Sequence, residues 1–149
     1  MKNPLSYFIV IIFIFNPLTI AQHNLDQEKV GDLTVLIHNL KNNKGEVKIG
    51  LFNSEDSYNG KKEKYKGAML KVENKQAKWV IENIPFGEYA IKAFHDEDGD
   101  DKVDTNFIGM PTERYGFSNN VKGLFGPPSF DKAKFHFDKE EMQIEIKLK

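Results

Sequence analysis

The 149-residue sequence contains no cysteine, which excludes disulfide bonds, thiol catalysis, iron–sulfur clusters and cysteine-ligated zinc. It also lacks an excess of either charge, because 21 Lys and Arg residues face 22 Asp and Glu residues. A general nucleic-acid-binding protein needs a basic surface to neutralise phosphates, so the charge balance disfavours this class. The sequence has no phosphate-binding loop, no dinucleotide fingerprint and no H-E-x-x-H zinc motif. The length is typical of a single domain.

The first 21 residues have the layout of a secretory signal peptide. Lys2 supplies the positive charge, an apolar run covers residues 5–15, and Thr19 and Ala21 suit cleavage before Gln22. An apolar run of about eleven residues is too short to span a bilayer, which takes about twenty. We therefore expect a signal peptide at residues 1–21, a flexible leader at 22–30 and one domain at 31–149. The location expected is periplasmic or extracellular.

Alternation of apolar and polar residues predicts seven short β-strands. They cover residues 33–37, 47–51, 68–72, 77–81, 89–93, 133–137 and 142–148. Asn74 and Lys75 predict a tight turn, and Ser54 is a candidate cap for one helical turn. No stretch has convincing helical periodicity, so the crossover helices of a parallel sheet are missing. The expected fold is an all-β, seven-stranded antiparallel β-sandwich of immunoglobulin-like or transthyretin-like type.

Residues 97–131 show no clear strand pattern and form the longest irregular segment of the sequence. Structureless loops of more than about 15 residues are uncommon in compact domains and are usually functional or disordered. This segment holds several aromatic residues, too much apolar area to leave in water, together with glycines and prolines. We therefore expect one long ordered loop, folded against one end of the sandwich and carrying any functional site.

An acidic run directly after the strand at 89–93 is the strongest chemical signal. Asp96, Asp98, Asp100 and Asp104 stand at relative positions 1, 3, 5 and 9, and the Lys102 carbonyl falls at position 7. Hard oxygen ligands at this spacing suit Ca²⁺, as in the first part of an EF-hand loop. The sequence therefore predicts a calcium site with these five residues as ligands and a structural role for the ion.

Three departures separate this run from an EF-hand. Asp101 replaces the glycine that makes the sharp turn at position 6, and Phe107 replaces the bidentate glutamate at position 12. Flanking helices are also missing, so the last ligand must come from elsewhere, and Asn106 and Glu113 are candidates. The alternative interpretation is a solvated acidic turn, although carboxylates bunched in this way repel one another.

His95 is the one histidine placed to do chemistry. It follows the inward-facing residues of a strand and directly precedes the acidic run, where it could orient a carboxylate, act as a base or ligate a metal. We favour the simpler interpretation of a hydrogen-bonded histidine at the edge of the core. Ser118 lacks the second glycine of a nucleophile elbow. The candidate residues for contact with a ligand or partner are His95, Arg114, Tyr115, Phe117, Ser118, Asn119 and Phe125.

Four stretches resemble the signature of a bacterial exported family, domain-of-unknown-function family 2141. They are FHDEDGDDKVDTNFIG at residues 94–109, YGFSNN at 115–120, FGPPSF at 125–130 and IPFGEYA at 84–90. The resemblance spans about residues 33–148 and implies an exported, often periplasmic, β-rich domain with no established activity. The family usually has glycine where this sequence has Asp101. The IPFGEYA corner is also similar to that of transthyretin-like and carboxypeptidase-regulatory-like sandwiches, which concerns the fold alone.

The function expected is that of an exported, non-catalytic β-sandwich with a calcium-stabilised acidic loop. Its long aromatic and Gly/Pro-rich segment would present a surface to an unidentified protein or small molecule. Nucleic acid is not an expected partner, and no membrane span is expected after signal cleavage. One alternative is a metal-assisted hydrolase that uses His95 and the loop carboxylates, and it requires an open pocket at His95. The other is a purely structural envelope protein, which would not respond to metal.

Overall fold

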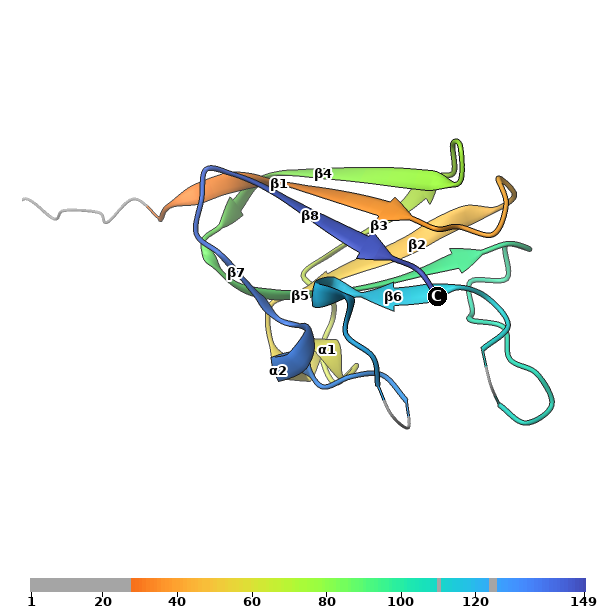
Figure 1. The fold of residues 1–149 in the computed structure, drawn as a ribbon. Helices are drawn as coiled ribbons and strands as arrows, with labels where there is room; N and C mark the ends of the chain where they lie inside the picture. Colours follow the sequence, from red (N-terminus) through yellow and green to blue (C-terminus); the bar gives the residue numbers. More distant parts are fainter. Residues whose placement is uncertain (1–27, 110, 124–125) are drawn as a thin grey trace, which may run out of the picture.

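The computed structural model describes residues 28–109, 111–123 and 126–149 (Figure 1). The predicted signal peptide and most of the predicted leader lie outside these residues. No helix in the described ranges is long and apolar enough to cross a bilayer.

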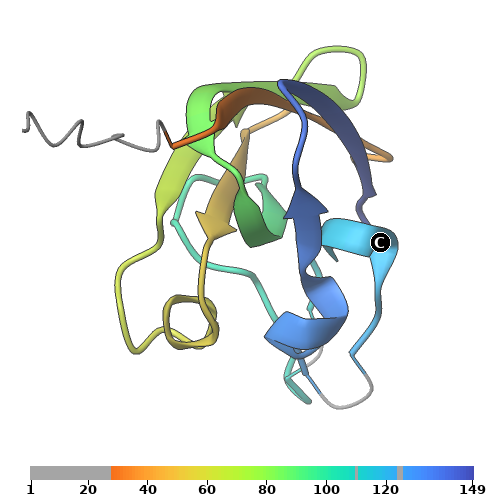
Figure 2. The same cartoon turned by 90° about the vertical axis from the view of Figure 1, so that its left-hand side faces the viewer.

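The chain forms two β-sheets and few helical turns. The elements are β1 Val30–His38, β2 Glu46–Phe52, α1 Glu55–Tyr58, β3 Lys66–Lys71, β4 Gln76–Pro85, β5 Gly87–Asp96, β6 Tyr115–Phe117, the 3-10 helix η1 Ser118–Asn120, α2 Phe130–Ala133, β7 Phe135–Phe137 and β8 Glu141–Lys147. One sheet has the order β4-β1-β8, and the other has the order β3-β2-β5-β6 with β7 also paired to β5. The sheets form two layers, as Figures 1 and 2 show from perpendicular directions.

The all-β prediction is confirmed, but the strand count is eight rather than seven. The additional strand is β6, which lies inside the segment predicted to contain no strand. It has only three residues, with Gly116 in the middle, so it is too short to show an alternating pattern. The prediction also placed Ala133 in a strand, whereas it ends α2.

The prediction of purely antiparallel pairing is wrong at one place, because β1 and β8 run parallel. Parallel neighbours need a long connection, which is usually a crossover helix. Here the connection is the whole intervening chain, which builds the second sheet on its way from β1 to β8. The other strand pairs of the described chain are antiparallel.

The main core lies between the two sheets and comes from the alternating positions of the strands. Leu33 and Val35 of β1 face Val47 and Leu51 of β2, and each of these four side chains is fully buried. A second, smaller cluster is formed by Tyr58, Ala90, Phe117, Phe130 and Ala133. It attaches α1, α2 and the end of β6 to the outer face of β5, so β5 is buried on both faces.

Two local predictions are confirmed. Asn74 and Lys75 both adopt positive φ, 52° and 57°, and join β3 to β4 in a two-residue turn of the type that suits hairpins. Ser54 caps α1, because its hydroxyl oxygen accepts a hydrogen bond from the amide of Ser57 at 3.3 Å.

Candidate metal centre

The acidic run begins where β5 ends, against the start of β2. Asp96 is fully buried and pairs in register with Glu46 of β2. The turn before β2 passes very close to it, because Gly45 has a φ of +62° and a Cβ at that position would lie 1.9 Å from the carbonyl oxygen of Asp96. The first acidic residue is therefore held by the sheet, while the residues after it are free to curl.

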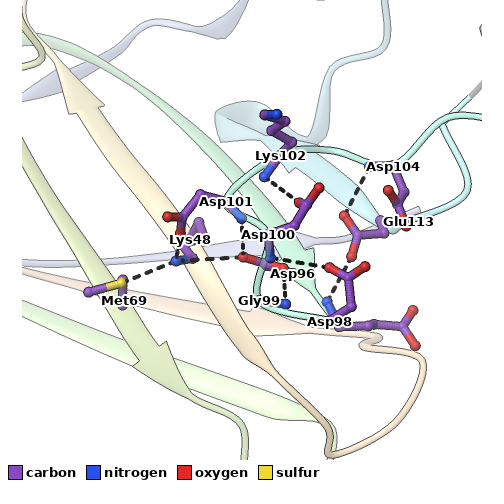
Figure 3. Close-up of polar contacts among 11 residues, drawn as sticks. Lys48, Met69, Asp96, Asp98, Gly99, Asp100, Asp101, Lys102, Asp104 and Glu113 are labelled. Carbon is purple, nitrogen blue, oxygen red and sulfur yellow. Dashed lines mark hydrogen bonds and ion pairs between the residues drawn. The ribbon is translucent and has the colours of Figure 1, made fainter.

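Asp96 organises the first turn of the loop. One of its carboxylate oxygens accepts the amide of Gly99 at 2.8 Å, and the other accepts the amide of Asp101 at 3.1 Å (Figure 3). Both donor residues are in the left-handed region, with φ of 81° and 68°. Asp101 thus adopts the conformation for which the EF-hand pattern uses glycine, which aspartate tolerates better than most residues.

The next two carboxylates also accept backbone amides of the loop, each from the residue two positions later. Asp98 accepts the amide of Asp100 at 3.2 Å, and Asp100 accepts the amide of Lys102 at 2.8 Å. Each bond keeps the side chain turned back over the loop (Figure 3). Asp96, Asp98 and Asp100 therefore lie together in one curled loop, and their role as metal ligands remains a prediction. The part expected for the Lys102 carbonyl remains a prediction.

Glu113 closes the loop from its far end. Its side chain is buried, and its two carboxylate oxygens accept the amides of Glu97 at 2.7 Å and Asp104 at 3.2 Å. Carboxylate oxygens of Asp98, Asp104 and Glu113 lie within 4.8 Å of one another, as do those of Asp96, Asp98 and Asp100. Asp98 belongs to both groups. Glu113, one of the two residues expected to complete the ligand set, is therefore part of the cluster.

Negative charge accumulates in this cluster. Asp98 raises the pKa of the Asp104 carboxyl group most, followed by partial burial and by Asp100 and Asp96. Lys48 of β2 brings one ammonium group, paired with Asp96 at 3.5 Å and with Asp101. One lysine cannot balance all of these carboxylates, and an added cation would relieve the repulsion that remains.

Protonation of Asp96 is expected to destabilise the fold in acid. Burial alone would raise the pKa of its carboxyl group, but the amides of Gly99 and Asp101 and the ammonium of Lys48 outweigh burial and lower it. A carboxyl group with a lowered pKa stabilises the folded protein at neutral pH, and this contribution is lost as the pH falls below about 4. The stability deficit of Asp96→Asn should therefore shrink on acidification, as measured by urea unfolding at several pH values.

The control for this titration is Asp138→Asn at an exposed position. The stability change of Asp96→Asn is compared with that of this variant at each pH. A deficit for Asp96→Asn that stays constant down to acid would contradict the assigned role of the Asp96 carboxylate.

A family model matches residues 35–145 of the chain, and its description is an uncharacterized protein conserved in bacteria, DUF2141. The chain belongs to this family. The match covers the whole acidic run and Glu113, so the candidate metal centre lies inside the DUF2141 domain. Neither the curated proteins nor the solved structures gave a match.

His95 is sealed inside the DUF2141 domain. Its side chain is fully buried, with Nε2 2.7 Å from the carbonyl oxygen of Lys44. Successive residues of a strand point to opposite faces, so His95 faces away from the side occupied by the Asp96 carboxylate. The favoured interpretation, a hydrogen-bonded histidine at the edge of the core, agrees with the burial and with the bond of Nε2, whereas buried Nδ1 has no hydrogen-bond partner within the described residues. The hydrolase alternative needs an open pocket at His95, whereas this side chain has no exposed surface and does not line the pocket beside β6 or the pocket between β3 and β4.

The other residues expected to contact a ligand have mostly structural positions. Ser118 is buried, with its hydroxyl accepting the amide of Ile91 at 2.9 Å and donating to the carbonyl of Ala133 at 2.5 Å. The amide nitrogen of Asn119 donates to the carbonyl of Lys134 at 2.7 Å. These bonds attach the long segment to β5 and α2, which is why it is ordered there without long strands.

The remaining candidates differ in exposure. The guanidinium of Arg114 donates to the Asn39 carbonyl at 2.6 Å. Phe117 is buried, and Tyr115 is 37% exposed with its ring packed edge-on against Phe117. Phe125 lies outside the described residues. Of the described aromatic candidates, Tyr115 therefore has the most side-chain surface available to a ligand.

Lys48 is a residue of this site that the sequence pattern does not reveal. It reaches the acidic loop only through the pairing of β2 with β5, in which Lys48 lies opposite Phe94. A register prediction for these two strands is the one signal that would have placed it beside Asp96.

Proposed function

We propose that this DUF2141 domain is an exported, non-catalytic β-sandwich that binds one Ca²⁺ ion in the loop between β5 and β6. The observation that carries the proposal is that Asp98 belongs to two clusters of three carboxylates each. The second cluster contains the buried Glu113, whose oxygens accept the amides of Glu97 and Asp104. The ion would replace repulsion within the loop by attraction and would hold the loop against the sheet. Its role would be structural rather than catalytic.

The donor set favours calcium over other ions. All candidate ligands are carboxylate or carbonyl oxygens on a flexible loop, and Ca²⁺ accepts six to eight such ligands in variable geometry. Mg²⁺ demands near-ideal octahedral geometry and keeps several waters, and softer metals prefer nitrogen or sulfur ligands. Export is proposed from the signal-peptide pattern of residues 1–21 and from the family resemblance.

Two observations separate this proposal from its alternatives. The hydrolase depended on His95 beside the metal, and the burial of His95 removes the base nearest the loop carboxylates. A solvated acidic turn would expose all of its carboxylates. Asp98, Asp100 and Asp104 are exposed here, but Asp96 and Glu113 are buried and hydrogen-bonded to loop amides. We also propose that the long segment presents Tyr115 to a partner or ligand.

Calcium is expected to raise the thermal stability of the chelator-treated protein. A ligand at a hundred times its dissociation constant adds about 2.7 kcal/mol to the free energy of unfolding, which raises Tm by several degrees in a domain of this size. The measurement is thermal unfolding in excess chelator, in millimolar Ca²⁺ and in millimolar Mg²⁺. The shift should be larger with Ca²⁺.

The double variant Asp98→Asn with Asp100→Asn should abolish the shift. Asparagine keeps an oxygen that can accept the loop amides, so the change removes charge with little loss of loop geometry. The matched control is Glu141→Gln with Glu145→Gln, which removes the same charge from two exposed positions on β8. The proposal fails if neither ion moves Tm, or if both double variants respond like the wild-type protein.

A further inference from the structure

A pocket of about 230 Å³ lies beside the C-terminal end of β8. Its lining comes from β6, from η1 and the residues after it, from the last residue of β8 and from the chain after β8. The lining includes Tyr115, Asn120, Lys122, Lys147 and Lys149. No lining residue of this pocket is acidic, so it differs in charge from the candidate metal centre.

The frame of the pocket is built from backbone pairing. The amide of Tyr115 donates to the carbonyl of Lys149 at 3.2 Å, and the amide of Lys149 donates back to the carbonyl of Tyr115 at 2.9 Å. The side chain of Asn120 accepts the amide of Lys147 at 2.7 Å and donates to the carbonyl of Glu145 at 3.1 Å. These bonds tie the end of β8 to β6 and η1, and the walls therefore need no rearrangement to receive a ligand.

The same wall contains strained backbone. Asn119 and Asn120 both have positive φ, 58° and 52°, and two consecutive left-handed residues cost free energy even for asparagine. At Gly116, a Cβ would lie 2.9 Å from side-chain atoms of Ile146 and Leu148, so only glycine lets β6 lie this close to β8. Both features keep this side of the pocket in one shape.

Three exposed lysines line the pocket, and no acidic residue lines it. Lys122, Lys147 and Lys149 line it, and none of them is ion-paired with a carboxylate within the described part of the chain. Within the described residues, the ammonium of Lys149 donates one long hydrogen bond, 3.4 Å, to the carbonyl of Asn120. Positive charges gathered in a hollow repel one another and attract an anion.

We propose that this pocket binds a small organic anion that carries a planar or apolar ring. The anionic group would lie between Lys122 and Lys147, and the ring would pack against the exposed part of Tyr115, whose other side rests on Phe117. Pockets for drug-sized ligands usually have about 300–1,000 Å³, so this smaller volume suits a compact ligand. Binding needs no metal and is independent of the proposed calcium site.

Phenyl phosphate is the probe, because it combines one ring with one anionic group. Titration into the chelator-treated protein is followed by amide chemical shifts, with inorganic phosphate and phenol as its two separate parts. Saturable shifts are expected at the amides of Gly116 and Lys147, with an affinity at least about ten-fold higher than for either part. Absence of saturation, equal affinity for inorganic phosphate, or shifts confined to other surfaces would overturn the proposal.

The double variant Lys122→Gln with Lys147→Gln should weaken phenyl phosphate binding by at least about ten-fold, because it removes two charge-assisted contacts. The matched control is Lys71→Gln with Lys78→Gln, which makes the same change in net charge at exposed positions on β3 and β4. Affinity in the control should stay within about two-fold. An equal loss in both double variants would show non-specific attraction and would overturn the proposal.

Discussion

Replacing Gly45 with alanine is expected to destabilise the protein by about 3–4 kcal/mol. The left-handed φ of +62° contributes part of this loss, and the remainder is steric, because the new Cβ would lie 1.9 Å from the Asp96 carbonyl oxygen. Backbone atoms cannot rotate away as a side chain can, so β2 and the end of β5 would have to separate. Urea unfolding measures the change in the free energy of unfolding.

Gly60→Ala is the matched control for this prediction. Gly60 also has a left-handed φ, +76°, but a Cβ there would meet nothing within 4 Å. Its loss should be only the conformational cost, about 1 kcal/mol. Gly45→Ala should also weaken any calcium response, because Asp96 starts the loop. Equal losses in the two variants would contradict the close approach of the Gly45 turn to Asp96.

Glu113→Gln is expected to destabilise the metal-free protein by about 2–3 kcal/mol. Both carboxylate oxygens of Glu113 accept backbone amides, from Glu97 and from Asp104. Glutamine keeps one acceptor but turns an amide donor toward the other backbone N–H, which leaves two donors facing each other in a buried place. Urea unfolding in excess chelator measures this loss without any contribution from a bound ion.

Hydrogen exchange makes this prediction specific to the loop. The amides of Glu97 and Asp104 should lose protection in Glu113→Gln, while the amides of β1 should change only as much as the global stability does. Glu141→Gln, at an exposed position of β8, is the control and should stay within about 0.5 kcal/mol of the wild-type protein. Unchanged protection at both loop amides would refute the proposed closure of the loop by Glu113.

The strands that could be predicted from the sequence are those with long alternation. The predicted ranges 33–37, 47–51 and 142–148 fall on β1, β2 and β8, and alternating apolar residues such as Leu33, Val35, Val47 and Ile146 are buried there. β6, in contrast to the equally short β7, was missed because Gly116 stands between two aromatic residues and no apolar–polar alternation is visible there. The parallel pairing of β1 with β8 was missed because local patterns hold no information on which distant strands become neighbours.

In the candidate site, too, local features could be predicted from the sequence and contacts between distant residues could not. The spacing of Asp96, Asp98 and Asp100 is a local property, and it predicted which carboxylates share a curled loop. Lys48 comes from another strand and could not be predicted. Ser118 and Asn119 are candidate ligand contacts in the sequence, and in the structure their side chains hydrogen-bond to backbone groups. In a long ordered loop, backbone N–H and C=O groups have no neighbouring strand to pair with, so polar side chains form hydrogen bonds with them.

The central claim is that the acidic loop holds one calcium ion, and a crystal structure of the protein grown in millimolar Ca²⁺ tests it most directly. The account predicts one ion with oxygen ligands from Asp98, Asp104 and Glu113 among its neighbours, at about 2.3–2.6 Å. Anomalous scattering would identify the ion as calcium. A loop whose carboxylates keep their amide bonds, with water alone among Asp98, Asp104 and Glu113 at saturating Ca²⁺, would contradict the claim.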